Sequence, residues 1–202
     1  SKCTSLTTIG SNAFVSCGEI TSLVLPPAFE TVGSKAFYNC KKLAGELALP
    51  SSLKGVNESA FAGGTRDDVS LAPKLTSLLG LENTKLATVG VAAFKGNMIG
   101  GALTFPVTLD SVGASAFQNN LITKVSFLNT TVDKIVLGSS CFQNNKIKTN
   151  PLTQGVRFGM ADYAFADNSL TGEFSFENEN VPAPARGVIS GNPGVTKVTI
   201  SK

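Results

Sequence analysis

The chain has 202 residues, enough for one domain with a sizeable core, and its 17 basic and 14 acidic side chains leave a net charge of +3. The basic residues are scattered singly apart from the pair Lys41-Lys42, which argues against nucleic-acid binding, and no apolar run approaches the roughly 20 residues of a membrane-spanning helix. The complete lack of histidine removes the commonest general base and the commonest metal ligand.

An Ala-Phe pair recurs along the whole chain. Its Ala falls at positions 13, 36, 60, 93 and 116, and the series continues with Cys141-Phe142, Ala164-Phe165 and Val188-Ile189. The successive spacings are 23, 24, 33, 23, 25, 23 and 24 residues. This regularity predicts a repeat solenoid of about eight units of 23–25 residues. The one long spacing indicates an insertion in the third repeat, which we place at about 63–73 ("GGTRDDVSLAP").

A short alternating segment follows most of these pairs. Its members are Leu23-Val24-Leu25, Leu47-Ala48-Leu49, Leu79-Gly80-Leu81, Leu103-Thr104-Phe105, Val125-Ser126-Phe127, Val156-Arg157-Phe158, Phe174-Ser175-Phe176 and Val198-Thr199-Ile200. We call these the Leu-x-Leu segments. Alternation of this kind predicts a strand with one buried face. Stacked units then give short parallel strands on one wall of the solenoid, with Ala-Phe turns or short helical segments on the other.

Two further columns of residues are predicted to be structural. The Phe of each pair points inward to fill the space between the walls (Phe14, Phe37, Phe61, Phe94, Phe117, Phe142 and Phe165). Three residues later stands a Cys or an Asn (Cys17, Cys40, Asn97, Asn120, Asn145, Asn168 and Asn192). A buried Asn donates and accepts hydrogen bonds at once, so this column is expected to satisfy the backbone where each turn bends.

The combined pattern "L-x-x-I-G-x-x-A-F-x-x-C/N-x-x-L-x-x-L-x-L-P" resembles the BspA-like leucine-rich repeat family of surface proteins. The resemblance runs from "CTSLTTIGSNAF" to "NPGVTKVTIS". It implies a leucine-rich repeat fold, display at the cell surface or secretion, and adhesion to host matrix proteins such as fibronectin or fibrinogen. The chain is read as a single domain, 1–202, that forms part of a longer protein.

Catalysis, metals and cofactors are not expected. The four cysteines contain no CxxC pair, and the acidic stretch 173–180 and the pair Asp67-Asp68 match no calcium-loop spacing. Cys3, Cys17 and Cys40 occupy neighbouring units, where stacked side chains run parallel; buried free thiols are favoured over disulfides, and Cys141 is expected to be buried and isolated.

The outward positions of the Leu-x-Leu segments are the candidate binding surface, because they vary without harm to the core. From this face we select Lys124, Ser126, Arg157, Glu173 and Ser175 as candidate contact residues for an extracellular protein. A structural spacer rod that displays another domain is the alternative function. A carbohydrate-binding module ranks last, because Tyr38 and Tyr163 are the only tyrosines and the chain has no tryptophan.

Overall fold

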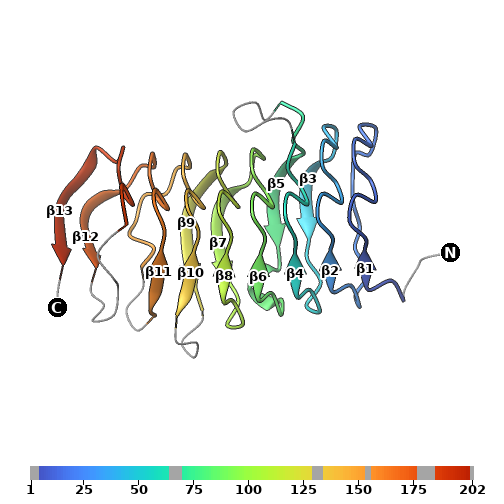
Figure 1. Cartoon of the computed structure of the whole chain (residues 1–202), viewed down its shortest axis with the longest axis horizontal. Coiled ribbons are helices and arrows are strands. Elements are labelled where there is room, and N and C mark those ends of the chain that lie inside the picture. The colour runs from blue at the N-terminus through green and yellow to red at the C-terminus, as the bar shows by residue number, and fades with distance from the viewer. Residues whose placement is uncertain (1–4, 64–69, 129–133, 153–155, 177–184, 201–202) are drawn as a thin grey trace.

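The computed structural model describes residues 5–63, 70–128, 134–152, 156–176 and 185–200. The chain coils into successive turns that stack side by side, with the first turn at one end of the molecule and the last turn at the other (Figure 1). This arrangement is the solenoid that the repeat spacing predicts.

One parallel sheet runs along the solenoid through seven turns, and its strand order follows the chain. Its strands are β1 (Thr8–Ile9), β2 (Thr31–Val32), β4 (Gly55–Val56), β6 (Thr88–Val89), β8 (Ser111–Val112), β10 (Ile135–Leu137) and β11 (Phe158–Met160). In the two-residue strands the first side chain faces outward or is small, and the aliphatic second one is buried. These strands precede the Ala-Phe pairs, so the continuous sheet is not the one that we expected from the Leu-x-Leu segments.

A glycine follows most of these short strands because the turns approach one another closely there. A Cβ atom on Gly113 would lie 2.6 Å from the backbone nitrogen of Val91, and one on Gly138 would lie 2.4 Å from that of Ala114. Both contacts are far below a normal van der Waals separation, so the tight approach of adjacent turns depends on glycine at this step.

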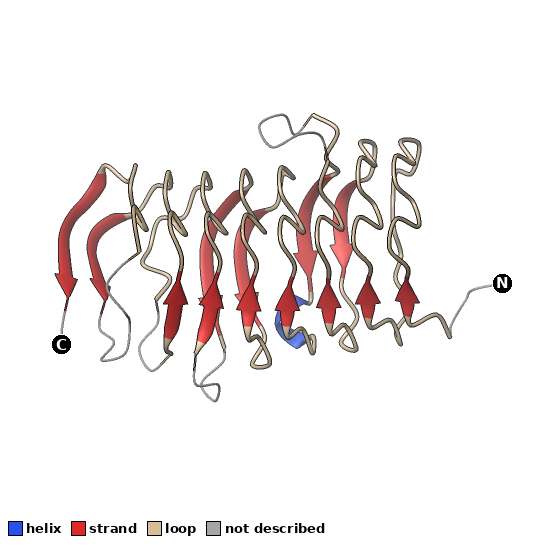
Figure 2. Cartoon of the chain, viewed as in Figure 1, coloured by secondary structure: helices blue, strands red, loops and turns tan. Residues whose placement is uncertain are grey.

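Most of the Leu-x-Leu segments lie in strands that pair only two by two, whereas Leu23-Val24-Leu25 in the first turn forms no strand (Figure 2). The parallel pairs are β3 (Ala44–Ala48) with β5 (Lys74–Leu79), β7 (Gly100–Phe105) with β9 (Leu121–Phe127), and β12 (Thr171–Phe176) with β13 (Gly194–Ile200). Each pair has a register shift directly after a glycine with positive φ, at Gly45, Gly101 or Gly172. Between β9 and β12, the sixth turn carries Asn150-Pro151, and proline has no amide to donate to a ladder.

Two assignments of Leu-x-Leu segments were wrong. In the third turn Leu78 faces the core and Leu79 is 45% exposed; Gly80 then adopts φ 77°, and Leu81 is buried in the 3-10 helix η1 (Leu81–Asn83). In the sixth turn Phe158 begins β11 of the long sheet and pairs with Ile135. The strand register was displaced in the third turn, and in the sixth turn the segment belongs to the long sheet.

The Ala-Phe wall is built from tight turns. The residue before each pair has a positive φ, from Asn12 at 60° to Gly187 at 62°. The Phe amide donates to a carbonyl of the following turn at every step, for example from Phe117 to Cys141 at 2.8 Å and from Phe142 to Ala164 at 2.9 Å. This second backbone ladder ties successive turns together in the segment that follows each strand of the long sheet. The expectation of turns on this wall is confirmed, and η1 is the one helical segment among the described residues.

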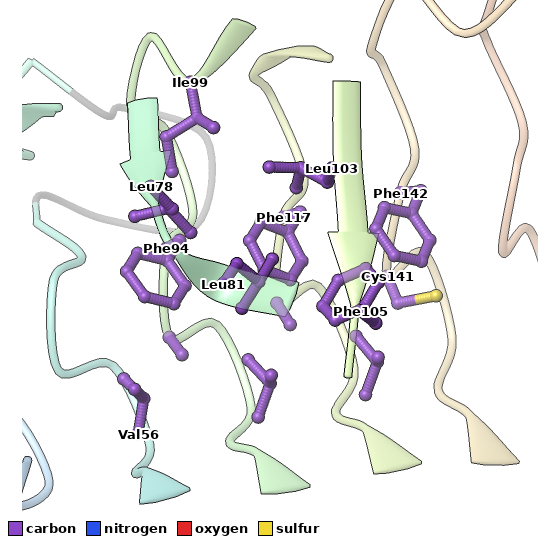
Figure 3. Packing of buried hydrophobic residues seen from close by; sticks show 14 of the residues in the cluster. Val56, Leu78, Leu81, Phe94, Ile99, Leu103, Phe105, Phe117, Cys141 and Phe142 are labelled. Carbon is purple, nitrogen blue, oxygen red and sulfur yellow. The ribbon is translucent and has the colours of Figure 1, made fainter. Parts of the chain in front are cut away.

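The phenylalanine column is confirmed as the centre of the core. Successive rings stack with centroids 5.2–5.5 Å apart from Phe14 to Phe165. Figure 3 shows Phe94, Phe117 and Phe142 in this row, with Phe105 and Leu103 packed against them from β7. Phe14 is 39% exposed because it belongs to the first turn and stacks only on Phe37. The inward strand residues Phe105, Phe127, Phe158, Phe174 and Phe176 are buried as predicted.

The asparagine column also takes its predicted role. Asn97, Asn120, Asn145, Asn168 and Asn192 are all buried. The Asn145 amide donates to the carbonyls of Phe142 and Phe117, at 3.0 and 2.9 Å, and its Oδ1 accepts from the Ile122 amide at 3.1 Å. Each Asn thus joins its own turn to the preceding one.

The cysteines in this column differ from one another. Cys40 is buried, and its thiol donates to the Phe14 carbonyl at 3.1 Å. Cys17 was expected to be buried but is exposed, because it lies in the first turn and no described residue covers it. Cys141 is fully buried beside Phe142, as predicted. All three are free thiols, whereas Cys3 lies outside the described residues.

Candidate functional site

The outward positions of the Leu-x-Leu segments form one surface along the solenoid. Alternation places an outward side chain between two that point into the core, as Ser126 stands between the buried Val125 and Phe127 in β9. With the register of the third turn corrected, the outward column reads Val24, Ala48, Leu79, Thr104, Ser126, Ser175 and Thr199. We call this surface the strand face.

In the N-terminal part of the strand face the outward column itself is apolar, with the exposed Glu46 two residues before Ala48 on β3. Val24 is 91% exposed, and Leu79 lies directly opposite Ala48 in the β3–β5 pair. A shallow groove of about 280 Å³ runs beside them and is lined by Leu25, Pro27, Ala48, Leu49, Pro50 and Ser51. This patch was not predicted, because the triplet Leu79-Gly80-Leu81 suggests Gly80 as the outward residue. Alternation alone could not have found the register, because the bulge after Leu75 puts both Leu75 and Leu78, three residues apart, in the core.

The C-terminal part of the strand face is polar and includes four of the predicted contact residues. Lys124 is exposed on β9 and Ser126 is half-buried two residues later. Glu173 on β12 forms an ion pair with Lys197 of β13 at 3.1 Å and accepts a hydrogen bond from the Thr199 hydroxyl. The hydrogen bond from Thr199, and next the one from Lys197, lower the pKa of Glu173. Its carboxylate is therefore held charged on the surface.

Ser175 occupies the same strand as Glu173, two residues further on. Its side chain is half-buried, and its carbonyl accepts a hydrogen bond from the Asn150 side chain at 3.4 Å. The structure therefore brings Glu173 and Ser175 together on β12, and it places Lys124 and Ser126 together on β9.

Arg157, the fifth predicted contact residue, is not part of this column. It directly precedes β11, and its carbonyl accepts from the Ile135 amide at 2.8 Å within the long sheet. The side chain is exposed. The assignment failed because "VRF" has the letters of a Leu-x-Leu segment but belongs to the strand that precedes an Ala-Phe pair.

The two tyrosines lie apart from the strand face, on the Ala-Phe wall. Tyr163 is half-buried under the guanidinium of Arg186, which lies 5.3 Å from the ring centroid, and Arg186 also pairs with Asp162 at 3.3 Å. Tyr38 is half-buried in the second turn. Neither ring presents a free face on the strand surface for stacking a sugar.

The strand face is a broad surface of small, apolar and charged side chains. Among the residues that the structure describes, no group of three or more His, Cys, Asp or Glu side chains is placed to hold a metal ion. Within the same residues, no helix has the length and apolar character needed to cross a membrane. Chemically, this face supplies apolar contact area, exposed cations and hydroxyl groups.

Comparison with known proteins agrees with the fold. The sequence model of the BspA-type leucine-rich repeat region matches six copies over residues 7–80 and 74–183. No curated protein matches the chain. Among solved structures, the chain is similar to the crystal structure of a leucine-rich repeat protein from Bacteroides ovatus ATCC 8483, at 18% identity and a TM-score of 0.46. The match covers 97% of this chain and 59% of that protein, so this chain spans less than two thirds of its length.

Proposed function

The chain belongs to the BspA-type leucine-rich repeat family, and on that premise we propose that it is a non-catalytic protein-binding module whose strand face contacts an extracellular protein. The proposal places the protein at the cell surface or in the secreted fraction. Fold alone does not determine function, so the support comes from the chemistry of the strand face.

The exposed apolar column Val24, Ala48 and Leu79 is the observation that carries this proposal. Val24 is 91% exposed and Leu79 is 45% exposed, with Ala48 between them in the column, so neither side chain is fully used by the core; the groove along Leu25 and Pro50 extends the same apolar area. Contiguous apolar surface of this kind marks interaction sites in soluble proteins. These side chains form the centre of the proposed contact.

Polar residues further along the face form the rim of the proposed contact. Lys124 extends into solvent, and the Glu173–Lys197 pair fixes a carboxylate beside Ser175. Charges at the edge of an interface mainly steer association and select partners. Arg157 remains a proposed contact, but it lies on a different face, so a partner that uses it must reach around the solenoid.

The first experiment measures binding of the purified chain to immobilised fibronectin and fibrinogen by surface plasmon resonance. Leu79→Lys places a charge in the apolar patch and is expected to weaken binding by about tenfold or more. Val136→Lys is the matched control: Val136 is 46% exposed against 45% for Leu79, but it lies on the long sheet. Equal loss in both variants would contradict a site on the strand face.

A second pair of variants tests the polar rim. Lys124→Glu should slow association and reduce its dependence on salt concentration, because a steering charge acts at long range. Lys134→Glu changes another exposed lysine, next to the long sheet, and should leave the association rate unchanged. Unchanged kinetics in Lys124→Glu would remove this residue from the interface.

The spacer alternative has its own structural support. Two backbone ladders and the continuous stack of phenylalanine rings join each turn to its neighbours, which makes the solenoid stiff. A chain that binds neither matrix protein, and whose antibody-labelled form is found on intact cells, would favour the spacer over the binding module.

A further inference from the structure

Several exposed cations of this solenoid lie opposite an acidic side chain of the neighbouring turn. Lys42 pairs with Glu19 at 2.7 Å, and Lys54 pairs with Glu30 at 2.8 Å. Neighbouring strands of a sheet lie only about 4.8 Å apart, so equivalent positions of adjacent turns are close enough for such pairs. The charge that a turn presents is therefore set against the charges of the turns beside it.

The fifth and sixth turns instead bring three lysines together. Lys146 and Lys148 are exposed on either side of the buried Ile147, so both side chains point away from the core. The Lys148 amide donates to the carbonyl of Thr123 at 3.2 Å, which places Lys148 beside the exposed Lys124 of the preceding turn. None of the three lysines forms an ion pair with another described residue. We call them the lysine cluster.

Acidic groups of the next turn do not balance the lysine cluster. Glu173 forms an ion pair with Lys197 at 3.1 Å and accepts a hydrogen bond from the Thr199 hydroxyl. Asp167 accepts from the Gln143 side chain at 2.8 Å on the Ala-Phe wall. Like charges on adjacent strands cost stability, so the fold gains nothing from grouping these lysines. An anionic ligand accounts for their position, because it supplies the missing opposite charge.

We propose that the lysine cluster (Lys124, Lys146 and Lys148) binds a sulfated polysaccharide that lies across the fifth and sixth turns. A sulfate ester carries one permanent negative charge, and the ammonium group of lysine is a compact point charge with three donors. The cluster contains no arginine, whose planar fork recognises carboxylates and phosphates through two parallel hydrogen bonds. This site goes beyond the protein contact proposed above and shares only Lys124 with it.

The surface around the lysine cluster also suits a sugar. The Lys146 amide donates to the carbonyl of Ile122 at 2.9 Å, so Lys146 lies beside Leu121, which is 44% exposed. The C–H face of a pyranose ring can pack against such an apolar side chain while its sulfate groups reach the lysines. Thr149, exposed next to Lys148, adds a hydroxyl donor.

Other polyanions fit this surface less well. Proteins that bind single-stranded nucleic acid stack the bases on exposed aromatic rings, whereas Phe127 and Phe142 of these two turns are buried. An acidic protein partner gains most of its affinity from large aromatic or arginine anchors, and the cluster is bordered by the small residues Thr123 and Ser126. A sulfated polysaccharide needs neither feature.

Surface plasmon resonance of the whole chain on immobilised heparin, a sulfated polysaccharide used as the probe, tests the proposal. The unchanged chain should bind at about 0.15 M salt, and its affinity should fall as the salt concentration rises. The double variant Lys146→Glu/Lys148→Glu should bind about tenfold or more weakly, because two attractions become repulsions. Lys124 is left unchanged, so the result does not depend on the protein contact.

Lys85→Glu/Lys134→Glu is the matched control. Each double variant lowers the net charge by 4, from +3 to −1, and both replace exposed lysines. Lys85 and Lys134 lie outside the cluster, where they precede β6 and β10 of the long sheet. This control should keep most of the affinity for heparin, and circular dichroism should show the same fold in all three proteins.

An equal loss in the two double variants overturns the proposal, because overall charge and not a site would then govern binding. A chain that does not bind heparin at about 0.15 M salt overturns it too. Duplex DNA and polyglutamate separate the classes of polyanion: the chain should bind each of them at least about tenfold more weakly than heparin. Equal affinity for either one overturns the assignment to a sulfated polysaccharide.

Discussion

The ring of Phe117 stacks on the ring of Phe142 in the next turn, with centroids 5.5 Å apart and planes within 5° of parallel. The same relationship joins each neighbouring pair in the column from Phe14 to Phe165. Each ring in the middle of the column therefore supports two turns at once. The stability of the solenoid depends on this column more than on any single strand.

Phe117→Ala should lower the free energy of unfolding by about 3–5 kcal/mol, because a fully buried ring leaves a cavity between two neighbouring rings. Phe14→Ala should cost only about 1–2 kcal/mol, since Phe14 is partly exposed and stacks on one side. Urea unfolding followed by circular dichroism measures both. A loss below about 1 kcal/mol for Phe117→Ala would contradict its place in the core.

Asn145→Ala should destabilise the fold by about 3 kcal/mol, because it leaves the Ile122 amide and the Phe117 carbonyl without their buried partner. Asn144→Gly is the control. It removes only an exposed hydrogen bond to Asn119, and glycine accepts the positive φ of 54° at this position. If the two variants unfold at the same urea concentration, the Asn145 bridge contributes nothing to stability.

Gly113→Ala should destabilise the protein by about 3 kcal/mol, since the new methyl group would meet the backbone of the preceding turn at 2.6 Å. Gly55→Ala offers a comparison within the long sheet, because a Cβ there finds no atom closer than 3.9 Å. This second change should be neutral or stabilising by up to about 1 kcal/mol through the unfolded state. Differential scanning calorimetry of both variants tests the close approach directly.

Thiol labelling should separate the cysteines. In a Cys3→Ser variant at pH 8 and low protein concentration, we expect Cys17 to react fast with a thiol reagent, while Cys40 and Cys141 react only after unfolding. Burial raises the pKa of Cys40 and of Cys141, so both have less thiolate at pH 8 than an exposed cysteine. Mass spectrometry of the labelled peptides identifies the sites. Rapid native labelling of Cys40 would show that the first two turns open readily.

The core columns were predictable because each is marked by a residue type at a fixed step. Phe117 and Asn120 stand three residues apart in a repeated frame, and only one inward orientation satisfies all copies. The seven-stranded sheet was not predictable in this way, because a two-residue strand such as Thr88–Val89 is too short to show alternation. The glycine that follows most of these strands was the sequence signal for the sheet. Its role, the close approach of the neighbouring turn, is visible only in the structure.

The candidate site was predicted less well than the core, because the residue type at its positions differs from one repeat to the next. Leu79 was misplaced because an apolar triplet has several possible registers, and Arg157 because the same letters occur in a strand of the long sheet. In the third turn, the bulge between Leu75 and Ser77 sets the register, and Gly80 with a positive φ follows the end of β5. The exposure of Cys17 could not be predicted from the repeat pattern, because Cys17 and the buried Cys40 occupy the same position of the repeat.

The third unit has a further consequence. β4 and β6 pair directly, with Gly55 opposite Thr88, although the Ala-Phe spacing there is 33 residues instead of 23–25. The pairing of β4 with β6 therefore does not depend on the number of residues between the two strands. The entropic cost of closing a loop grows only slowly with its length. We therefore expect the third unit to tolerate the insertion of a foreign peptide. An epitope or an affinity tag spliced between Gly63 and Ser70 would be carried on a rigid support without redesign of the surrounding turns.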